Sequence, residues 1–277
     1  QDIIRDPEKR RKLVVYINPP YAEADNRKGQ GRRGVAKSYI HKKYDTMMGY
    51  AKRELFVQFF ARIYNELPSC TIAAFSTLTL LQGSKFSKMR ENFKVRLARS
   101  FMVPANTFDN VKGEFPIAFQ VMRCHGDEPF KDTGIDVYGS KGDFWGIKHV
   151  FAYNKEKYIN DWTLSFIEDD DMSTNDISLG TIIGIANDFQ NQSTVRIENP
   201  FKPWNHQYQW QITKNNLLHS CVYLCCRRCI KHSWLNHNDQ FLHPTPGWKK
   251  DKEFISDCLA YTLFNEKNYI KDRKSVV

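Results

Sequence analysis

A short apolar segment that ends in two consecutive prolines constrains the fold of this 277-residue chain more than any other feature. Residues 13–17 read Leu-Val-Val-Tyr-Ile, and Asn18-Pro19-Pro20-Tyr21 follows directly. A continuous apolar run of this length is typical of a buried strand in a parallel sheet. Because proline fixes φ and lacks a backbone donor, the strand has to end at this turn. The sequence therefore predicts an α/β fold with Asn18 and Tyr21 at the carboxyl end of a buried strand, where open α/β sheets bind their ligands.

Helices and strands alternate over the next hundred residues. A helix is predicted at about 50–67, where large apolar residues recur at helical spacing, and a shorter helix at about 86–93. The predicted strands cover residues 71–76, 95–103 and 115–122, the last two being joined by a turn-rich segment. This order predicts that residues 1–125 form the second half of an open α/β sheet, closed by a hairpin. Residues 126–277 are predicted to form a second, mixed α+β region with helices at about 215–235 and 253–264.

The segment from Ala22 to Thr46 is predicted to be a long basic loop. It carries a net charge of +4, within a chain whose net charge is +10 and whose pI is about 9.2. Such a balance favours a polyanionic partner, above all nucleic acid. The residues predicted to contact its phosphates are Arg27, Lys28, Arg32, Arg33, Lys37, Lys42 and Lys43.

The Asn-Pro-Pro-Tyr turn carries groups suited to a planar amine. The Asn18 amide oxygen and the Pro19 carbonyl can both accept a hydrogen bond from one exocyclic NH2 group, and Pro20 stiffens the turn that holds them. Tyr21 offers a flat ring on which a base can stack, worth roughly 1–3 kcal/mol per base. Accepting both N–H bonds localises the amine lone pair, so that the amine can attack an electrophilic methyl group.

At these residues the sequence resembles the amino-group methyltransferases that use S-adenosylmethionine. Asn18-Pro19-Pro20-Tyr21 matches the catalytic motif of that family. The resemblance implies the second half of a Rossmann-like methyltransferase sheet, followed by a target-recognition region. Residues 98–122 are similar to the late hairpin of the adenine enzymes, where an aromatic side chain packs against the extruded base. Phe108 is the matching position, and we expect it to contact the base.

The context selects DNA among the substrates of this motif. The basic segment at 22–46 suits phosphate contacts beside a flipped base, and about 150 residues follow the hairpin, as in restriction–modification methyltransferases. The resemblance thus implies a site-specific DNA adenine-N6 methyltransferase with duplex DNA as partner, accompanied by a restriction endonuclease subunit or a fused nuclease. Two alternatives stay open, a non-catalytic DNA-binding module and an RNA adenine methyltransferase.

The cofactor motif of the family, a strand followed by a glycine-bearing turn and an acidic residue, belongs upstream of the catalytic strand. Only twelve residues precede Leu13, and the glycines of Gly29-Gln30-Gly31 follow the catalytic strand instead. We therefore expect the chain to be a piece of a longer protein that lacks most of the S-adenosylmethionine site. Alone, this piece is expected to be inactive in methyl transfer.

Other candidate sites have simpler interpretations. Cys221, Cys225 and Cys229 recur at helical spacing within an apolar pattern, so they are predicted to pack as small hydrophobic residues rather than to bind zinc. The acidic run 168–171 is predicted to be a solvated loop rather than a Mg2+ site. No metal site is predicted. Arg227, Arg228 and Lys231 are expected on the polar side of their helix, free to meet phosphate or solvent.

Composition excludes some classes of protein. The mean hydropathy is −0.58, and no run approaches the roughly 18 apolar residues of a membrane span. Seven cysteines, four of them within residues 221–229, do not suggest a secreted disulfide framework. We expect no membrane partner and a cytoplasmic location.

Overall fold

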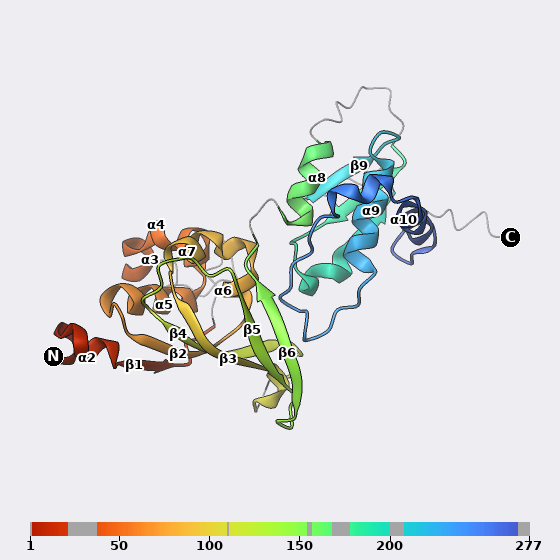
Figure 1. Cartoon of the computed structure of the whole chain (residues 1–277). Coiled ribbons are helices and arrows are strands. Elements are labelled where there is room, and N and C mark those ends of the chain that lie inside the picture. Colours follow the sequence, from red (N-terminus) through yellow and green to blue (C-terminus); the bar gives the residue numbers. More distant parts are fainter. Residues whose placement is uncertain are drawn as a thin grey trace. The chain divides into compact units, whose positions relative to one another are not determined.

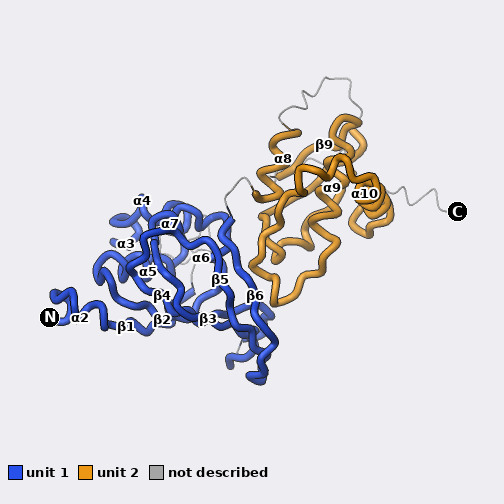
Figure 2. Tube along the Cα trace, in the orientation of Figure 1, with its two compact units in different colours: residues 1–153 blue, residues 154–277 orange. Residues whose placement is uncertain are grey.

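The computed structural model describes residues 2–21, 38–109, 111–153, 157–167, 178–199 and 208–270. The chain divides into two compact units, residues 1–153 and residues 154–277 (Figure 2). The predicted α/β class is confirmed, because a mixed sheet and helices build the first unit (Figure 1).

The first unit contains a six-stranded sheet in the order β1-β2-β4-β3-β5-β6. Strand β1 pairs in parallel with β2, and β4 lies antiparallel between β2 and β3, as the predicted closing hairpin requires. Strands β5 and β6 extend the sheet beyond β3. The strands are β1 (Val14–Ile17), β2 (Thr71–Ser76), β3 (Arg96–Pro104), β4 (Pro116–Arg123), β5 (Asp132–Tyr138) and β6 (Phe144–Phe151).

Helices cover one face of this sheet (Figure 1). Phe56, Phe60 and Met89 from the helices pack against Ile72 and Met122 of the sheet in one hydrophobic core. The short helices α1 (Asp2–Arg5) and α2 (Pro7–Arg11) precede β1, and α2 begins with Pro7 behind the capping side chain of Asp6. The others are α3 (Tyr39–Lys43), α4 (Asp45–Met48), the 3-10 segment η2 (Gly49–Arg53), α5 (Leu55–Glu66), α6 (Thr79–Gln82), η3 (Ser84–Phe86), α7 (Ser87–Asn92) and η4 (Ala105–Thr107).

The opposite face of the sheet carries a row of aromatic rings that reaches from β1 to β6. Adjacent rings lie 5.0–6.3 Å apart between centroids. The rings belong to Tyr16, Phe75, Phe119, Phe101, Tyr138 and Phe144. At its two ends the row is open, since Tyr16 is 68% exposed and Phe144 is 58% exposed.

The prediction that residues 13–17 form a buried strand is wrong in one respect. Strand β1 is parallel to β2 as expected, but it is the edge strand of the described sheet, and Val14 is 58% exposed. Leu13, Val15 and Ile17 pack against the core, whereas Val14 and Tyr16 are exposed. The strand thus has the apolar character of a parallel strand on both faces, but only one face is covered by the helices.

Two other boundaries differ from the predictions. The predicted loop ended at Thr46, but helices α3 and α4 begin within it, at Tyr39 and Asp45. The Ser38 hydroxyl caps α3 by accepting from the His41 amide at 2.9 Å. The division between units falls after Tyr153 rather than near residue 125, because β5 and β6 add to the first sheet. Whether the two units correspond to a catalytic and a recognition part stays a prediction.

The second unit packs helices against a three-stranded antiparallel sheet in the order β8-β7-β9. Ile182 and Trp210 of the sheet share a core with Phe166 and Tyr223 of the helices. Helix α9 ends at Arg228, earlier than predicted. The elements are α8 (Ile159–Ile167), β7 (Gly180–Gly184), η6 (Phe189–Thr194), β8 (Arg196–Glu198), β9 (Tyr208–Ile212), α9 (Leu217–Arg228), η7 (Pro246–Lys250) and α10 (Lys252–Phe264).

A fully buried arginine anchors α9 in this unit. The Arg227 guanidinium donates to Asn160 Oδ1 at 3.0 Å, to the Ala186 carbonyl at 2.8 Å and to Tyr223 Oη at 2.9 Å. It also lies 4.8 Å from the centroid of the Phe241 ring. The expectation that Arg227 faces solvent or phosphate is therefore wrong, since its side chain is 0% exposed.

Among the residues that the structure describes, none of the helices has the length and apolar composition that a bilayer crossing requires.

Candidate active site

An apolar cavity of about 340 Å³ lies where β1 and β2 end, on the aromatic face of the sheet. Its size falls near the lower end of the roughly 300–1,000 Å³ of small-ligand pockets. Two polar residues, Asn18 and Thr77, line it from the ends of these two strands. The apolar lining comes from Tyr21, Phe75, Phe108, Val111, Phe115 and Ile117.

Asn18 is exposed and follows directly on the last residue of β1. Its amide forms no hydrogen bond with another described residue, so its oxygen is available to a ligand in the cavity. Pro19 is buried, whereas Pro20 is exposed. The buried proline fixes the direction in which the chain leaves the strand.

Tyr21 is held in place by its hydroxyl group. Its Oη donates a hydrogen bond of 2.8 Å to the Phe75 carbonyl at the end of β2. The ring also contacts Phe56 of α5, with 6.1 Å between centroids. Burial raises the pKa of Tyr21 to about 12, so the hydroxyl keeps its proton and this bond throughout the neutral range. The sequence indicated the ring but not this bond.

Replacing Tyr21 with phenylalanine is therefore expected to lower the stability of the protein, although the ring is kept. The ring area stays, but the bond to the Phe75 carbonyl is lost, which is expected to lower the free energy of unfolding by about 1 kcal/mol. Urea unfolding followed by circular dichroism measures this change. Tyr39→Phe, which alters an exposed tyrosine away from the cavity, is the control. Equal stability of the two variants would show that the bond contributes nothing.

Phe108 reaches the cavity from the segment that follows η4. Its ring packs edge-to-face on Phe75, with 5.6 Å between centroids, and the side chain is 36% exposed. The backbone bond from Phe108 N to the Ala105 carbonyl, 3.0 Å long, fixes the turn. The structure thus brings Asn18, Tyr21 and Phe108 to one cavity. Their roles in binding or catalysis stay predictions.

Five lining residues were missed from the sequence, namely Phe75, Thr77, Val111, Phe115 and Ile117. All but Val111, which lies in the turn-rich segment, belong to predicted strands or their ends. The alternation of side chains along a strand was the available signal, because residues 71, 73, 75 and 77 share the face that residue 18 extends.

The predicted phosphate contacts divide into two groups. Arg27, Lys28, Arg32, Arg33 and Lys37 lie outside the described residues. Lys42 is exposed on α3, whereas Lys43 pairs with Glu66 at 3.3 Å. The hydrogen bonds that the Lys43 ammonium donates to Tyr44 and Glu66 raise the pKa of Lys43 to about 12, and the one to Tyr44 has the larger effect.

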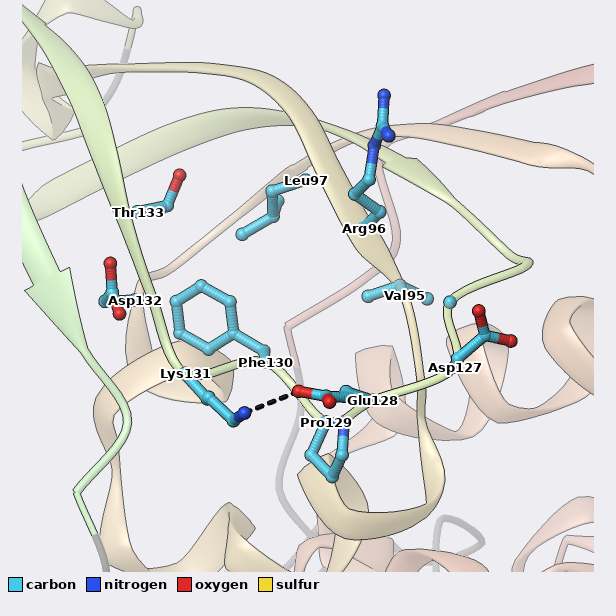
Figure 3. Close-up of a pocket in the computed structure, with 11 residues that line it drawn as sticks. Val95, Arg96, Leu97, Asp127, Glu128, Pro129, Phe130, Lys131, Asp132 and Thr133 are labelled. Atoms are coloured by element: carbon cyan, nitrogen blue, oxygen red, sulfur yellow. Dashed lines mark hydrogen bonds and ion pairs between the residues drawn. The ribbon is translucent and has the colours of Figure 1, made fainter.

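A second cavity of the first unit, about 460 Å³ in volume, lies at the opposite end of the strands, around the start of β3 (Figure 3). Val95 and Leu97 line it together with the charged segment 127–132. Its Lys131 and Glu128 pair with each other at 2.5 Å. None of the predicted site residues lines this cavity.

The cysteines of α9 pack into the second unit, but Cys229, predicted to pack with them, is exposed directly after the helix. Cys225 and Cys226 contact a small core formed by Val222, Trp248 and Cys258. Burial raises the pKa of the Cys226 thiol to about 12, which keeps it protonated and apolar. In the described part of the chain, no three histidine, cysteine or carboxylate side chains converge as a metal site requires. The acidic run 168–171 lies outside the described residues.

No protein-family model and no curated protein matches this chain. The chain is distantly similar to solved structures of restriction–modification enzymes. The type IIL restriction-modification enzyme MmeI in complex with DNA shares 9% identity over 87% of this chain and 36% of its own, with a TM-score of 0.35. The type IIG restriction endonuclease BpuSI shares 14% over 99% of this chain and 37% of its own, with a TM-score of 0.35.

A third structure, the ATP-dependent type ISP restriction-modification enzyme LlaBIII bound to DNA, shares 10% identity over 48% of this chain and 10% of its own, with a TM-score of 0.31. The chain thus spans less than two fifths of the length of each of these three structures. At these identities and TM-scores the similarity identifies no family and supports no inference about function.

Proposed function

We propose that this chain forms the base-binding part of a DNA adenine-N6 methyltransferase that belongs to a restriction–modification system. One observation carries the proposal: the Asn18 amide and the rings of Tyr21 and Phe108 line a single apolar cavity at the end of a parallel strand. An acceptor beside flat apolar walls suits a planar base with an exocyclic amine. The Asn-Pro-Pro-Tyr motif, which matches that of the amino-group methyltransferases, indicates that the reaction is methyl transfer to this amine.

In this proposal the chain's own residues bind and orient the base. An adenine that leaves the duplex loses stacking worth roughly a few kcal/mol, which contacts with Tyr21 and Phe108 help to offset. The Asn18 amide oxygen and the Pro19 carbonyl then accept the two N–H bonds of the N6 amine. This arrangement directs the amine lone pair away from both acceptors and toward the methyl donor.

S-adenosylmethionine is the methyl donor that the motif implies, but the described residues do not fit it. Strand β1 runs into Asn18-Pro19-Pro20 and β2 into Thr77-Leu78, so neither leads into a glycine turn followed by an acidic residue. The glycine turn after β5 closes a hairpin with β6 and does not lead into a helix. The cavity at Asn18 is apolar, and its volume suits the base rather than the cofactor. We expect the cofactor site to lie mostly outside this chain.

Duplex DNA is the proposed partner, and the basic segment is proposed to contact its phosphates. If Arg27, Lys28, Arg32 and Arg33 neutralise four phosphates, they account for a slope of about −3.6 in a plot of log affinity against log salt concentration. Replacing all four with alanine is expected to flatten the slope by that amount. Fluorescence anisotropy over a salt series measures it. Alanine at Arg5, Lys9, Arg11 and Lys12 is the control of equal charge, and equal flattening by both variants would contradict a specific role for the segment.

The activity itself is tested with the protein translated from its complete reading frame. We expect N6-methyladenine in duplex DNA after incubation with S-adenosylmethionine, detected by mass spectrometry of the released nucleosides. Methylation confined to RNA would favour an RNA adenine methyltransferase. DNA binding without any methylated product would favour a non-catalytic DNA-binding module, and either result would overturn the proposal.

A further inference from the structure

The second unit contains a cavity of about 420 Å³ beside the first turn of α9. Trp162 and Phe166 of α8 line it together with His219 of α9. These rings form a packed cluster, with 5.1 Å between the centroids of Trp162 and Phe166 and 4.9 Å between those of Phe166 and His219. Trp248 closes the cluster behind them, 5.2 Å from His219. The cavity therefore has a rigid aromatic wall.

His219 gives this wall hydrogen-bonding capacity. Its Nδ1 is buried among the rings and has no hydrogen-bond partner among the described residues. A buried polar atom without a partner is unusual in a folded protein, and the ring that carries it lines the cavity. Burial, reinforced by the nearby charge of Lys249, lowers the pKa of His219 and keeps the ring neutral. A neutral imidazole can donate to or accept from a heterocycle, depending on its tautomer.

The remaining residues that line the cavity are polar, and the charge among them is positive. Ser165, Asn215, Asn216 and Lys249 complete the lining, and no acidic residue is among the described residues that line the cavity. The Lys249 ammonium lies 5.6 Å above the Trp248 ring, so it is held close to the aromatic wall. The cavity thus joins flat apolar surface, a neutral imidazole and a positive charge.

We propose that this cavity binds one nucleotide of the DNA, with its base against Trp162 and Phe166 and its phosphate beside Lys249. A planar base uses the rings and the imidazole, and the phosphate uses the ammonium. The inference rests on the proposed function for the identity of the polymer. It adds a second base-binding site, in a different unit from the cavity at Asn18.

The experiment follows the indole N–H signals of Trp162 and Trp248 by nuclear magnetic resonance while deoxyadenosine monophosphate is added to the chain. Trp162→Phe and Trp248→Phe assign the signals. We expect a saturable shift of the Trp162 signal. His219→Phe, which keeps the aromatic packing and removes both nitrogens, is expected to weaken binding about tenfold. Lys249→Gln is expected to weaken the nucleotide about threefold without affecting deoxyadenosine, and Lys250→Gln, which lies outside the lining, is expected to change neither.

Several results would overturn the inference. An equal shift with inorganic phosphate, together with none from deoxyadenosine, would make the cavity an anion site only. Absence of any saturable shift, or unchanged binding in His219→Phe, would equally reject a base site. Duplex DNA binding by the same samples separates the two proposals. A chain that binds DNA but not the nucleotide contradicts this inference alone, whereas a chain that binds the nucleotide but not DNA contradicts the proposed function.

Discussion

Replacing Asn18 with alanine in the complete protein is expected to reduce methyl transfer to DNA by about 100- to 1,000-fold while leaving DNA affinity almost unchanged. The Asn18 amide is proposed to act on the N6 amine, whose charge changes only as the methyl group is transferred. Its loss should therefore act on kcat, because the aromatic walls of the cavity and the phosphate contacts stay intact. Single-turnover methylation and DNA-binding titrations, carried out side by side, measure the two quantities.

Asn92→Ala is the matched control for this variant. Asn92 ends α7, and its amide donates to the Lys88 carbonyl at 2.8 Å. The Asn92→Ala substitution removes a side chain of the same kind, and Asn92 does not line the cavity at Asn18. Near-normal turnover of Asn18→Ala would show that Asn18 has no catalytic role and that the Asn-Pro-Pro-Tyr turn only shapes the fold. A parallel loss of DNA affinity would show that Asn18 binds DNA before any chemistry begins.

Replacing Arg227 with alanine is expected to destabilise the second unit by about 3 kcal/mol. The change opens a cavity under α9 and leaves the Ala186 carbonyl without its donor. Asn160 Oδ1 retains one partner, because Tyr223 Oη still donates to it at 3.1 Å. Urea unfolding followed by tryptophan fluorescence measures the loss, since Trp210 packs in the same core.

Lys231→Ala is the control for this second variant, because Lys231 is exposed shortly after the same helix. It removes one positive charge without a buried partner and is expected to leave stability within about 0.5 kcal/mol of the parent. An Arg227→Ala variant as stable as this control would mean that the buried guanidinium is replaced by water at no net loss. The Asn18 cavity lies in the other unit and is expected to keep its fold in both variants.

The elements with strong local signals were predicted well. Strand β2 was predicted at 71–76 and has these bounds, because its apolar run lies between clear breaks in the pattern. Helix α10, predicted at 253–264, begins one residue earlier behind the capping side chain of Asp251. Asn18, Tyr21 and Phe108 were selected from a motif and a resemblance, and they line the same cavity.

The errors have different physical causes, and only the burial of Arg227 depends on residues far apart in sequence. Arg227 looked solvent-exposed because charge usually marks a helix surface, yet oxygens from Asn160 and Ala186 surround it. Strands β5 and β6 were missed because exposed apolar residues such as Trp145 and Ile147 obscure the alternation that identifies a half-buried strand. Helices α3 and α4 were missed because the charges of Lys42 and Lys43 continued a basic run.

The position of β1 at the edge of the sheet has a consequence for the order of folding and for local opening. Among the described strands β1 pairs only with β2, and the chain between these two strands extends from residue 18 to residue 70. The pairs β3–β4 and β5–β6, by contrast, are neighbours in sequence. Closing the longer loop carries the larger entropy loss, so β1 is expected to join the sheet last and to open first. Because Asn18 follows directly on β1, its amide is expected to move whenever β1 opens. An additional strand along the outer edge of β1 would act as a clamp, tightening the position of Asn18 without touching it.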